Sequence, residues 1–272
     1  MEVKKVWSFY FSPAGTTQKT VCTIAEELAN QLSADYEQIS FTKFAERSKT
    51  YCFGNGDLVV VGTPTYAGKI PNKIMPDFKE KLQGNGALAV AVATYGNRAY
   101  ENSLAELYSI LNNNGFQTIA AAAIVCEHSF NKDLATGRPD ASDLFEFKAF
   151  SEKISEKLRS NNASPVQGVP GNADAPYYIP LDEEKKPAKF LKAKPKTDLS
   201  KCVKCGICSA NCPTAAIDPK DFSEVTGICI KCQSCIHRCP KQAKYFDDPV
   251  FTSHVRYVVK NYQDRKEHEF YL

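Results

Sequence analysis

One cysteine spacing pattern occurs twice near the end of this 272-residue sequence, and it constrains the fold more than any other feature. Each copy reads C-x2-C-x2-C-x3-C-P, and every cysteine recurs 27 positions later. Thiolates are favoured ligands of iron–sulfur clusters, and this spacing is typical of cubane [4Fe-4S] clusters. The repeat therefore predicts two such clusters. The first copy contains Cys202, Cys205, Cys208 and Cys212, and the second contains Cys229, Cys232, Cys235 and Cys239.

Two other uses of cysteine explain the pattern less well. A disulfide framework requires an oxidising compartment, and we expect no signal peptide because Met1 leads almost directly into a strand-like run. Zinc sites use two separated C-x2-C pairs, and a third cysteine at the next step suits one tetrahedral metal poorly. We therefore expect a cytoplasmic iron–sulfur protein. Exposed cubane clusters tend to be sensitive to oxygen, which favours an anaerobic host.

Residues 198 to 248 resemble the two-cluster bacterial ferredoxins. In that family pattern, the fourth cysteine of each copy ligates the other cluster. The resemblance implies that the region moves electrons one at a time. It assigns Cys202, Cys205, Cys208 and Cys239 to cluster 1, and Cys229, Cys232, Cys235 and Cys212 to cluster 2.

The N-terminal two-thirds of the sequence alternates between strand and helix patterns. Asp57 to Gly62 (DLVVVG), for example, contains a continuous β-branched run of the kind that is buried on both faces of a sheet. Five strands alternating with helices predict an α/β fold with a doubly wound parallel sheet, which binds ligands at the carboxyl ends of its strands. The expected strands are 3–11, 35–39, 57–62, 87–94 and 117–125, and the expected helices are 16–32, 71–82, 99–112 and 142–158.

The first of three loops at that edge is rich in small and hydroxyl residues. Hydroxyls and helix N-terminal N–H groups can bind a phosphate without lysine or arginine. The alternative is an ordinary strand-to-helix turn with a capping threonine. No G-x-G-x-x-G motif occurs at this turn, which argues against a dinucleotide. The candidate phosphate residues are Ser12, Ala14, Gly15, Thr16 and Thr17.

The second and third loops combine glycine with aromatic residues. A flat ring could stack there while backbone groups reach its heteroatoms. The alternative is that the tyrosines are half-buried loop anchors. The candidate ring-binding residues are Thr63, Pro64, Thr65, Tyr66, Ala67 and Gly68 in the second loop, and Thr94, Tyr95, Gly96, Asn97, Arg98 and Tyr100 in the third.

Residues 1 to about 160 resemble a flavodoxin, whose FMN phosphate loop and two ring-binding loops match these three loops. The flavodoxin pattern T-x-T-G-x-T aligns with Ser12 to Thr17, although Ala14 replaces a hydroxyl residue and removes one phosphate donor. With the cysteine region included, the chain resembles the flavodoxin–ferredoxin fusion family, sometimes called ferrodoxins. The resemblance implies a flavodoxin-like five-stranded parallel sheet, a small α+β two-cluster domain, FMN and two [4Fe-4S] clusters.

We therefore expect four regions: a flavodoxin-like domain at 1–160, a linker rich in proline and lysine at 161–197, a two-cluster domain at 198–250, and a tail at 251–272 that docks as a helix. Apolar residues near Tyr177 suggest that the linker lies against one domain, although a swinging tether is the competing hypothesis. No apolar stretch is long enough to span a membrane. A net charge of +3 gives no indication of nucleic-acid binding.

Three further segments bear on partners. Between Lys185 and Lys204 there are eight lysines and one acid, Asp198, which would suit an acidic redox protein or form a plain solvated face. The loop 127–141 is a candidate lid for a substrate or partner at the flavin edge. His237, inside the second cysteine copy, is expected to be a surface residue.

Three hypotheses for the function remain open. The first is an electron-transfer flavoprotein that relays electrons between FMN, two clusters and a redox partner. The second is an FMN-dependent reductase of a small organic molecule fed by its own clusters, and the third is a non-enzymatic redox or iron sensor. Tyr66, Tyr95 and Arg98 are the best candidates to touch the flavin ring, and no catalytic acid can be named. An open cavity above the flavin favours the reductase, whereas a flat exposed ring edge favours the carrier.

Overall fold

Five parallel strands form the centre of the structure, a computed structural model that describes residues 2–160 and 163–272. Their order across the sheet is β2-β1-β4-β6-β7. This is the order of the flavodoxin-like doubly wound fold, so the predicted fold class is confirmed. The strands are β1 (Lys5–Tyr10), β2 (Asp35–Ser40), β4 (Asp57–Pro64), β6 (Leu88–Tyr95) and β7 (Gln117–Val125).

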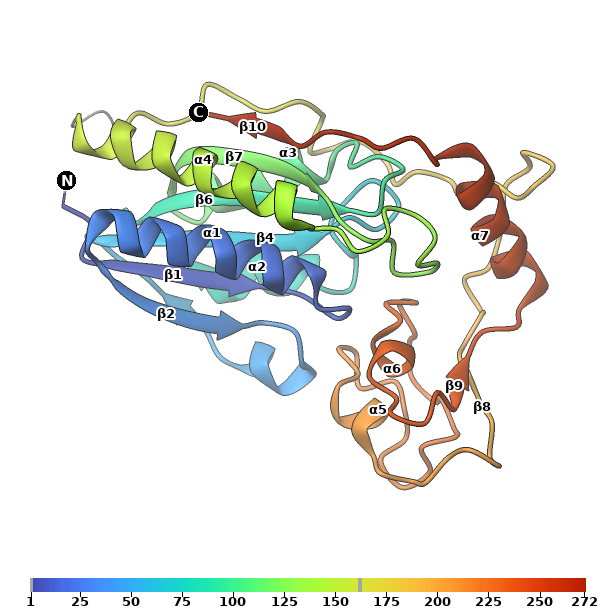
Figure 1. The fold of residues 1–272 in the computed structure, drawn as a ribbon. Helices are drawn as coiled ribbons and strands as arrows, with labels where there is room; N and C mark the ends of the chain where they lie inside the picture. The colour runs from blue at the N-terminus through green and yellow to red at the C-terminus, as the bar shows by residue number, and fades with distance from the viewer. Residues whose placement is uncertain (1, 161–162) are drawn as a thin grey trace.

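Two pairs of helices cover the two faces of this sheet (Figure 1). On one face, α1 (Thr16–Leu32) packs beside α4 (Ala141–Arg159) through an apolar stripe that includes Ile24 and Phe147. On the other face lie α2 (Met75–Lys81) and α3 (Ser103–Asn113). Both of these helices begin about four residues later than the sequence pattern indicated. Beside them are a 3-10 helix, η1 (Phe44–Ser48), and a two-stranded sheet of β3 (Tyr51–Cys52) and β5 (Leu82–Gln83).

The C-terminal tail forms more than the helix that was expected. After α7 (Pro249–Asn261), the chain returns to the sheet as β10 (Glu269–Tyr271), antiparallel to β7. The sheet therefore has a sixth strand, which three residues of sequence were too short to indicate. Asp143 of α4 anchors the tail, since its Oδ1 lies 2.7 Å from Arg138 Nη2 and accepts from His268 Nε2 at 3.1 Å.

The small domain repeats its backbone as well as its cysteines. Helix α5 (Ile207–Ala210) and helix α6 (Ser234–His237) occupy equivalent positions, 27 residues apart. Lys204 and Lys231 share a left-handed backbone, with φ of 55° and 58°. An antiparallel pair, β8 (Lys196–Thr197) and β9 (Lys244–Tyr245), closes the domain. The 27-residue repeat is therefore a repeat of structure.

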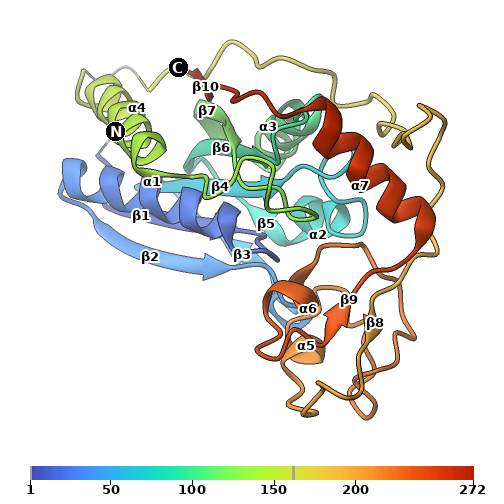
Figure 2. The ribbon, with the colours of Figure 1, turned by 45° about the vertical axis from the view of Figure 1, so that its right-hand side comes forward.

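The small domain lies beyond the carboxyl ends of the parallel strands, and α7 leads from it back to the large domain (Figures 1 and 2). The connecting segment runs along the large domain. Tyr178 N–H donates to the Ala67 carbonyl at 2.9 Å, and the Tyr177 hydroxyl donates to the Ile70 carbonyl at 2.7 Å. These contacts favour a fixed connection over a swinging tether. Within the described ranges, no helix is long and apolar enough to cross a membrane.

Candidate functional site

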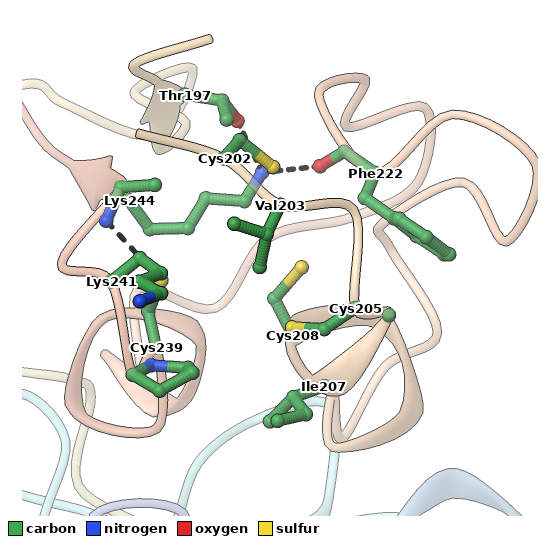
Figure 3. A pocket seen from close by; sticks show the side chains of 13 residues that line it. Thr197, Cys202, Val203, Cys205, Ile207, Cys208, Phe222, Cys239, Lys241 and Lys244 are labelled. Carbon is green, nitrogen blue, oxygen red and sulfur yellow. Dashed lines mark hydrogen bonds between the residues drawn. The ribbon is translucent and has the colours of Figure 1, made fainter. Parts of the chain in front are cut away.

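The eight repeat cysteines gather around two separate cavities in the small domain. Each cavity is lined by three cysteines of one copy and the fourth cysteine of the other copy, which is the grouping that the ferredoxin resemblance assigns. We call these groups set 1 and set 2. Set 1 is Cys202, Cys205, Cys208 and Cys239 (Figure 3), and set 2 is Cys229, Cys232, Cys235 and Cys212.

The surroundings of both sets fit a cubane cluster. All eight cysteines are free thiols, and apolar side chains such as Val203 and Phe222 complete the wall of the set 1 cavity. Backbone N–H groups point at the sulfurs: Ala243 N–H donates to Cys239 Sγ at 3.2 Å. Its counterpart 27 residues earlier, Ala216 N–H, donates to Cys212 Sγ at the same distance. Such hydrogen bonds stabilise thiolates and tune the potential of a bound cluster.

A third and much larger cavity, of about 990 Å³, lies at the carboxyl edge of the main sheet. Ligand pockets usually measure about 300–1,000 Å³, so this cavity can hold a flavin with space to spare. All three predicted flavin loops reach it. The sequence-predicted residues that line it are Ala14, Thr16, Thr17, Pro64, Thr65, Tyr66, Ala67, Thr94, Tyr95, Gly96 and Arg98.

Six predicted residues do not line this cavity, and several have other roles. Asn97 Nδ2 donates to the Tyr262 carbonyl at 2.7 Å, and the Tyr100 hydroxyl donates to Glu269 Oε2 at 2.7 Å. Both therefore hold the C-terminal tail. The Ser12 hydroxyl accepts from Gln18 N–H at 2.9 Å and so supports the first turn of α1. The six residues are Ser12, Gly15, Thr63, Gly68, Asn97 and Tyr100.

The start of α1 fits a phosphate group. The helix begins after Gly15, whose φ of 98° turns the chain, without a side-chain cap and without an acid in its first turn. Thr16 and Thr17 of this turn line the cavity. Helix N-terminal N–H groups and hydroxyls would suit a phosphate here, even though Ala14 supplies no hydroxyl.

Much of the cavity wall comes from beyond the flavodoxin-like domain, which the sequence did not indicate. Tyr177, Tyr178 and Phe190 of the connecting segment line it, as do His254 of α7 and the loop 226–231 of the small domain. The loop 127–141, predicted as a lid, contributes its first four residues to the wall. The aromatic residues of the connecting segment were visible in the sequence, but their position over the flavin loops was not.

Set 2 lies next to this cavity, whereas set 1 does not. Cys229 and Ile230 line the cavity, and Ile230 also packs against the apolar core of the large domain. Burial raises the pKa of the Tyr66 phenol well above its usual value, and the nearby thiols of Cys232 and Cys229 raise that pKa further. The second ring-binding loop and set 2 are therefore neighbours.

His237 of the same region is not the plain surface residue that the sequence suggested. Its Nε2 lies 2.9 Å from the carbonyl oxygen of Ser129, which lines the large cavity. The second cysteine copy is therefore tied to the cavity wall on this side too.

Two neutral histidines face the large cavity. Burial lowers the pKa of His128 to about 4, and the nearby charges of His254 and Arg98 lower it further. His128 Nδ1 accepts from Phe130 N–H at 3.1 Å, so its proton lies on Nε2. Burial also lowers the pKa of His254, against a hydrogen bond to the Leu181 carbonyl that raises it. At neutral pH neither ring adds charge to the cavity.

A comparison with protein families agrees with the position of the cysteine sets. Residues 195–218 match the family described as a 4Fe-4S binding domain. The comparison with curated proteins gives no match.

Similar solved structures include flavodoxins. One from the domain Archaea is 20% identical over 57% of this chain and 99% of its own, with a TM-score of 0.39. The Streptococcus pneumonia TIGR4 flavodoxin is 17% identical over 56% of this chain and 99% of its own, with a TM-score of 0.40. At these TM-scores the likeness carries no argument about function, and the fold assignment rests on the strand order. The chain joins a flavodoxin-like α/β domain to a 4Fe-4S ferredoxin-type domain.

Proposed function

We propose that this chain is an FMN and iron–sulfur oxidoreductase that connects a one-electron protein donor to a small organic acceptor. Set 1 and set 2 would each hold one [4Fe-4S] cluster, and the three loops of the large cavity would hold FMN. When bound, the clusters supply one-electron transfer and FMN supplies both one- and two-electron chemistry. The protein donor would supply electrons one at a time. Each acceptor molecule would take up two of these electrons and two protons from water.

One observation carries this proposal: Cys229 of set 2 lines the same cavity as the three flavin loops. The chain therefore brings a predicted cluster ligand to the wall of the predicted flavin site. Tyr66 stands on the flavin side of this wall, and Ile230 packs into the large domain. These contacts hold the two redox sites at one separation, as a relay inside one chain requires.

The position of set 1 suggests where electrons enter. Its cavity is lined by residues of the small domain alone, and Cys205 is exposed. An exposed ligand lets a partner protein approach the cluster closely. Lys204 is exposed beside it, so an acidic donor would be attracted to this end of the chain.

The walls of the large cavity favour a reductase over a carrier. A carrier that passes electrons from flavin to proteins needs an exposed ring edge. Here the connecting segment, α7 and the loop 226–231 add walls beyond the flavin loops. The cavity opens between exposed residues such as Leu191 and Ile228, which gives a small molecule access.

The test is an anaerobic preparation in which flavin, iron and sulfide are quantified before reduction. We expect one flavin and about eight irons per chain, as two cubane clusters require. Electrons added from a reduced acidic ferredoxin should reach the flavin. The reduction of the flavin is measured by its loss of visible absorbance. A loaded protein in which clusters and flavin did not equilibrate would overturn the relay.

A further inference from the structure

The large cavity extends beyond the three flavin loops. Past the ring-binding loops, its wall is made by the loop 127–130, the connecting segment and the loop 226–231. Leu191 and Ile228 line the cavity but are 88% and 61% exposed, so they lie at its mouth. We call this outer part, between the ring-binding loops and the mouth, the chamber.

Positive charge is concentrated around the chamber. Lys73, Lys192, Lys194 and Lys231 line the cavity, and no described carboxylate pairs with any of them. The four lysines carry a charge of +4, which exceeds the net charge of +3 of the whole chain. Like charges brought together favour a bound anion.

Hydrogen bonds fix two of these lysines without neutralising them. Lys231 Nζ donates to the Leu191 carbonyl at 2.5 Å and to the Cys229 carbonyl at 3.1 Å. Lys194 Nζ donates to the Val225 carbonyl at 2.5 Å. Because the acceptors are neutral, the ammonium charge of Lys194 remains available to an anion, whereas that of Lys231 also faces Cys229 and the Asp248 carboxylate. These bonds also tie the connecting segment to the small domain.

The other charged groups of the wall do not cancel this field. Arg98 donates to both carboxylate oxygens of Glu101, at 2.8 Å and 3.0 Å, so that pair is close to neutral. Glu127 is the single acid of the lining. His128 offers a neutral N–H donor from Nε2. The chamber is therefore cationic at its mouth and neutral, with one donor, further inside.

The chamber walls are aromatic. Phe190 stacks on His254 with centroids 5.2 Å apart and an interplanar angle of 29°. The Arg98 guanidinium lies over the Tyr178 ring at 3.8 Å. The Phe130 ring packs edge-on against the His128 ring, with centroids 5.2 Å apart. Aromatic side chains of this kind offer apolar contact to a planar organic molecule, whereas a small inorganic anion would gain nothing from them.

We propose that the chamber binds a planar organic anion, a conjugated carboxylate, with its flat part among the aromatic walls and its carboxylate towards the lysines at the mouth. The inference deepens the proposed function, on which it rests, by naming the class of acceptor. An acidic protein surface is a poorer occupant because the aromatic side chains line a cavity and a protein surface could reach only its mouth.

The test is direct binding of cinnamate to the anaerobic protein, with flavin and iron already quantified. Binding is followed by equilibrium dialysis and by perturbation of the flavin spectrum. Cinnamamide has the same shape without the charge, and we expect it to bind at least about tenfold more weakly, which corresponds to about 1.4 kcal/mol. The double variant Lys192→Gln/Lys194→Gln should lose about the same factor for cinnamate and nothing for cinnamamide.

A matched control removes the same charge elsewhere on the same segment. Lys185 and Lys189 are exposed and do not line the cavity, so Lys185→Gln/Lys189→Gln should leave cinnamate binding unchanged. Equal binding of cinnamate and cinnamamide, or equal loss in both double variants, would overturn the inference. A third result would also overturn it. If Lys192→Gln/Lys194→Gln were reduced more slowly by an acidic donor protein but bound cinnamate as before, these lysines would serve a protein partner.

The two proposals fail in different ways. A fully loaded protein that relays electrons but binds neither compound contradicts the chamber alone. A protein that takes up no flavin or no clusters contradicts the proposed function, and the chamber inference falls with it.

Discussion

The two cysteine copies have the same spacing and backbone but opposite surroundings. Val203 of the first copy is 58% exposed, whereas its counterpart Ile230 packs against the core of the large domain. Cys205 is exposed, whereas its counterpart Cys232 is only 8% exposed. Most of the first copy faces solvent, although the Pro213 carbonyl at its end accepts a buried hydrogen bond from Arg47 of the large domain. The second copy faces the large cavity.

This difference shows how two copies of one motif can come to lie in a fixed order between solvent and the large cavity. A repeat alone describes two equivalent redox sites. Docking one copy on another domain buries that copy and leaves the other as the exposed end. The order from solvent to set 1, set 2 and the large cavity follows from packing, because both copies carry the same ligands.

The largest effect on electron transfer is expected from single cysteine replacements, one made in each copy and compared with the other. We expect Cys232→Ala to stop electrons from passing between set 1 and the flavin, because its set lies between them. Cys205→Ala should remove the entry site but leave set 2 and the flavin in equilibrium. Each variant should lose about half of its iron. Anaerobic titration followed by electron paramagnetic resonance and flavin absorbance distinguishes them, and identical behaviour of the two variants would contradict the proposed order.

The docking of the second copy can be weakened at Ile230. Ile230→Ala removes apolar contacts with the large domain and should lower the free energy of unfolding by about 1–2 kcal/mol. The matched change in the first copy, Val203→Ala, removes an exposed side chain and should cost less than about 0.5 kcal/mol. Urea unfolding of the anaerobic protein measures both. Equal costs would mean that the two copies are equally exposed in solution.

Acid should destabilise the cavity side of the molecule. The pKa of His128 is about 4, below its unfolded value, because the ring is buried. The unfolded chain therefore binds the proton first, and stability is lost as the pH falls below about 6.5. Between pH 7.5 and 5.5 the loss at this residue should be about 1 kcal/mol. His128→Asn keeps an acceptor near Phe130 N–H and should remove that part of the pH dependence, as measured by urea unfolding. If the free energy of unfolding changed with pH as steeply as before, His128 would be exposed to solvent in the folded protein.

A small and local effect is expected at His237. The residue 27 positions earlier is Ala210, so His237→Ala makes the second copy resemble the first. Loss of the contact with the Ser129 carbonyl should cost about 1 kcal/mol and leave iron content unchanged. Hydrogen exchange at 127–131 should rise in this variant. Unchanged exchange would show that His237 does not help to hold the cavity wall.

Local patterns were sufficient to predict the five parallel strands, and the ferredoxin resemblance assigned the two cysteine sets. Leu58 to Val61 is apolar throughout because β4 is buried on both faces, and such a run can be recognised without a partner. By contrast, Asn97 and Tyr100 looked like flavin-loop residues, but they bind the C-terminal tail. Their partners lie more than 160 positions away. No local pattern indicates contacts of that kind.

The sequence by itself determined the flavodoxin-like fold and the spacing of the candidate cluster ligands, because ligand spacing and strand periodicity are properties of a few neighbouring residues. Only the tertiary structure decided which cysteine set adjoins the flavin cavity and what encloses it. The walls at 177–194, 226–231 and α7 are brought together by packing between segments far apart in the chain. The physical reason is that equivalent repeats carry the same local information, whereas burial depends on the surface against which each one packs.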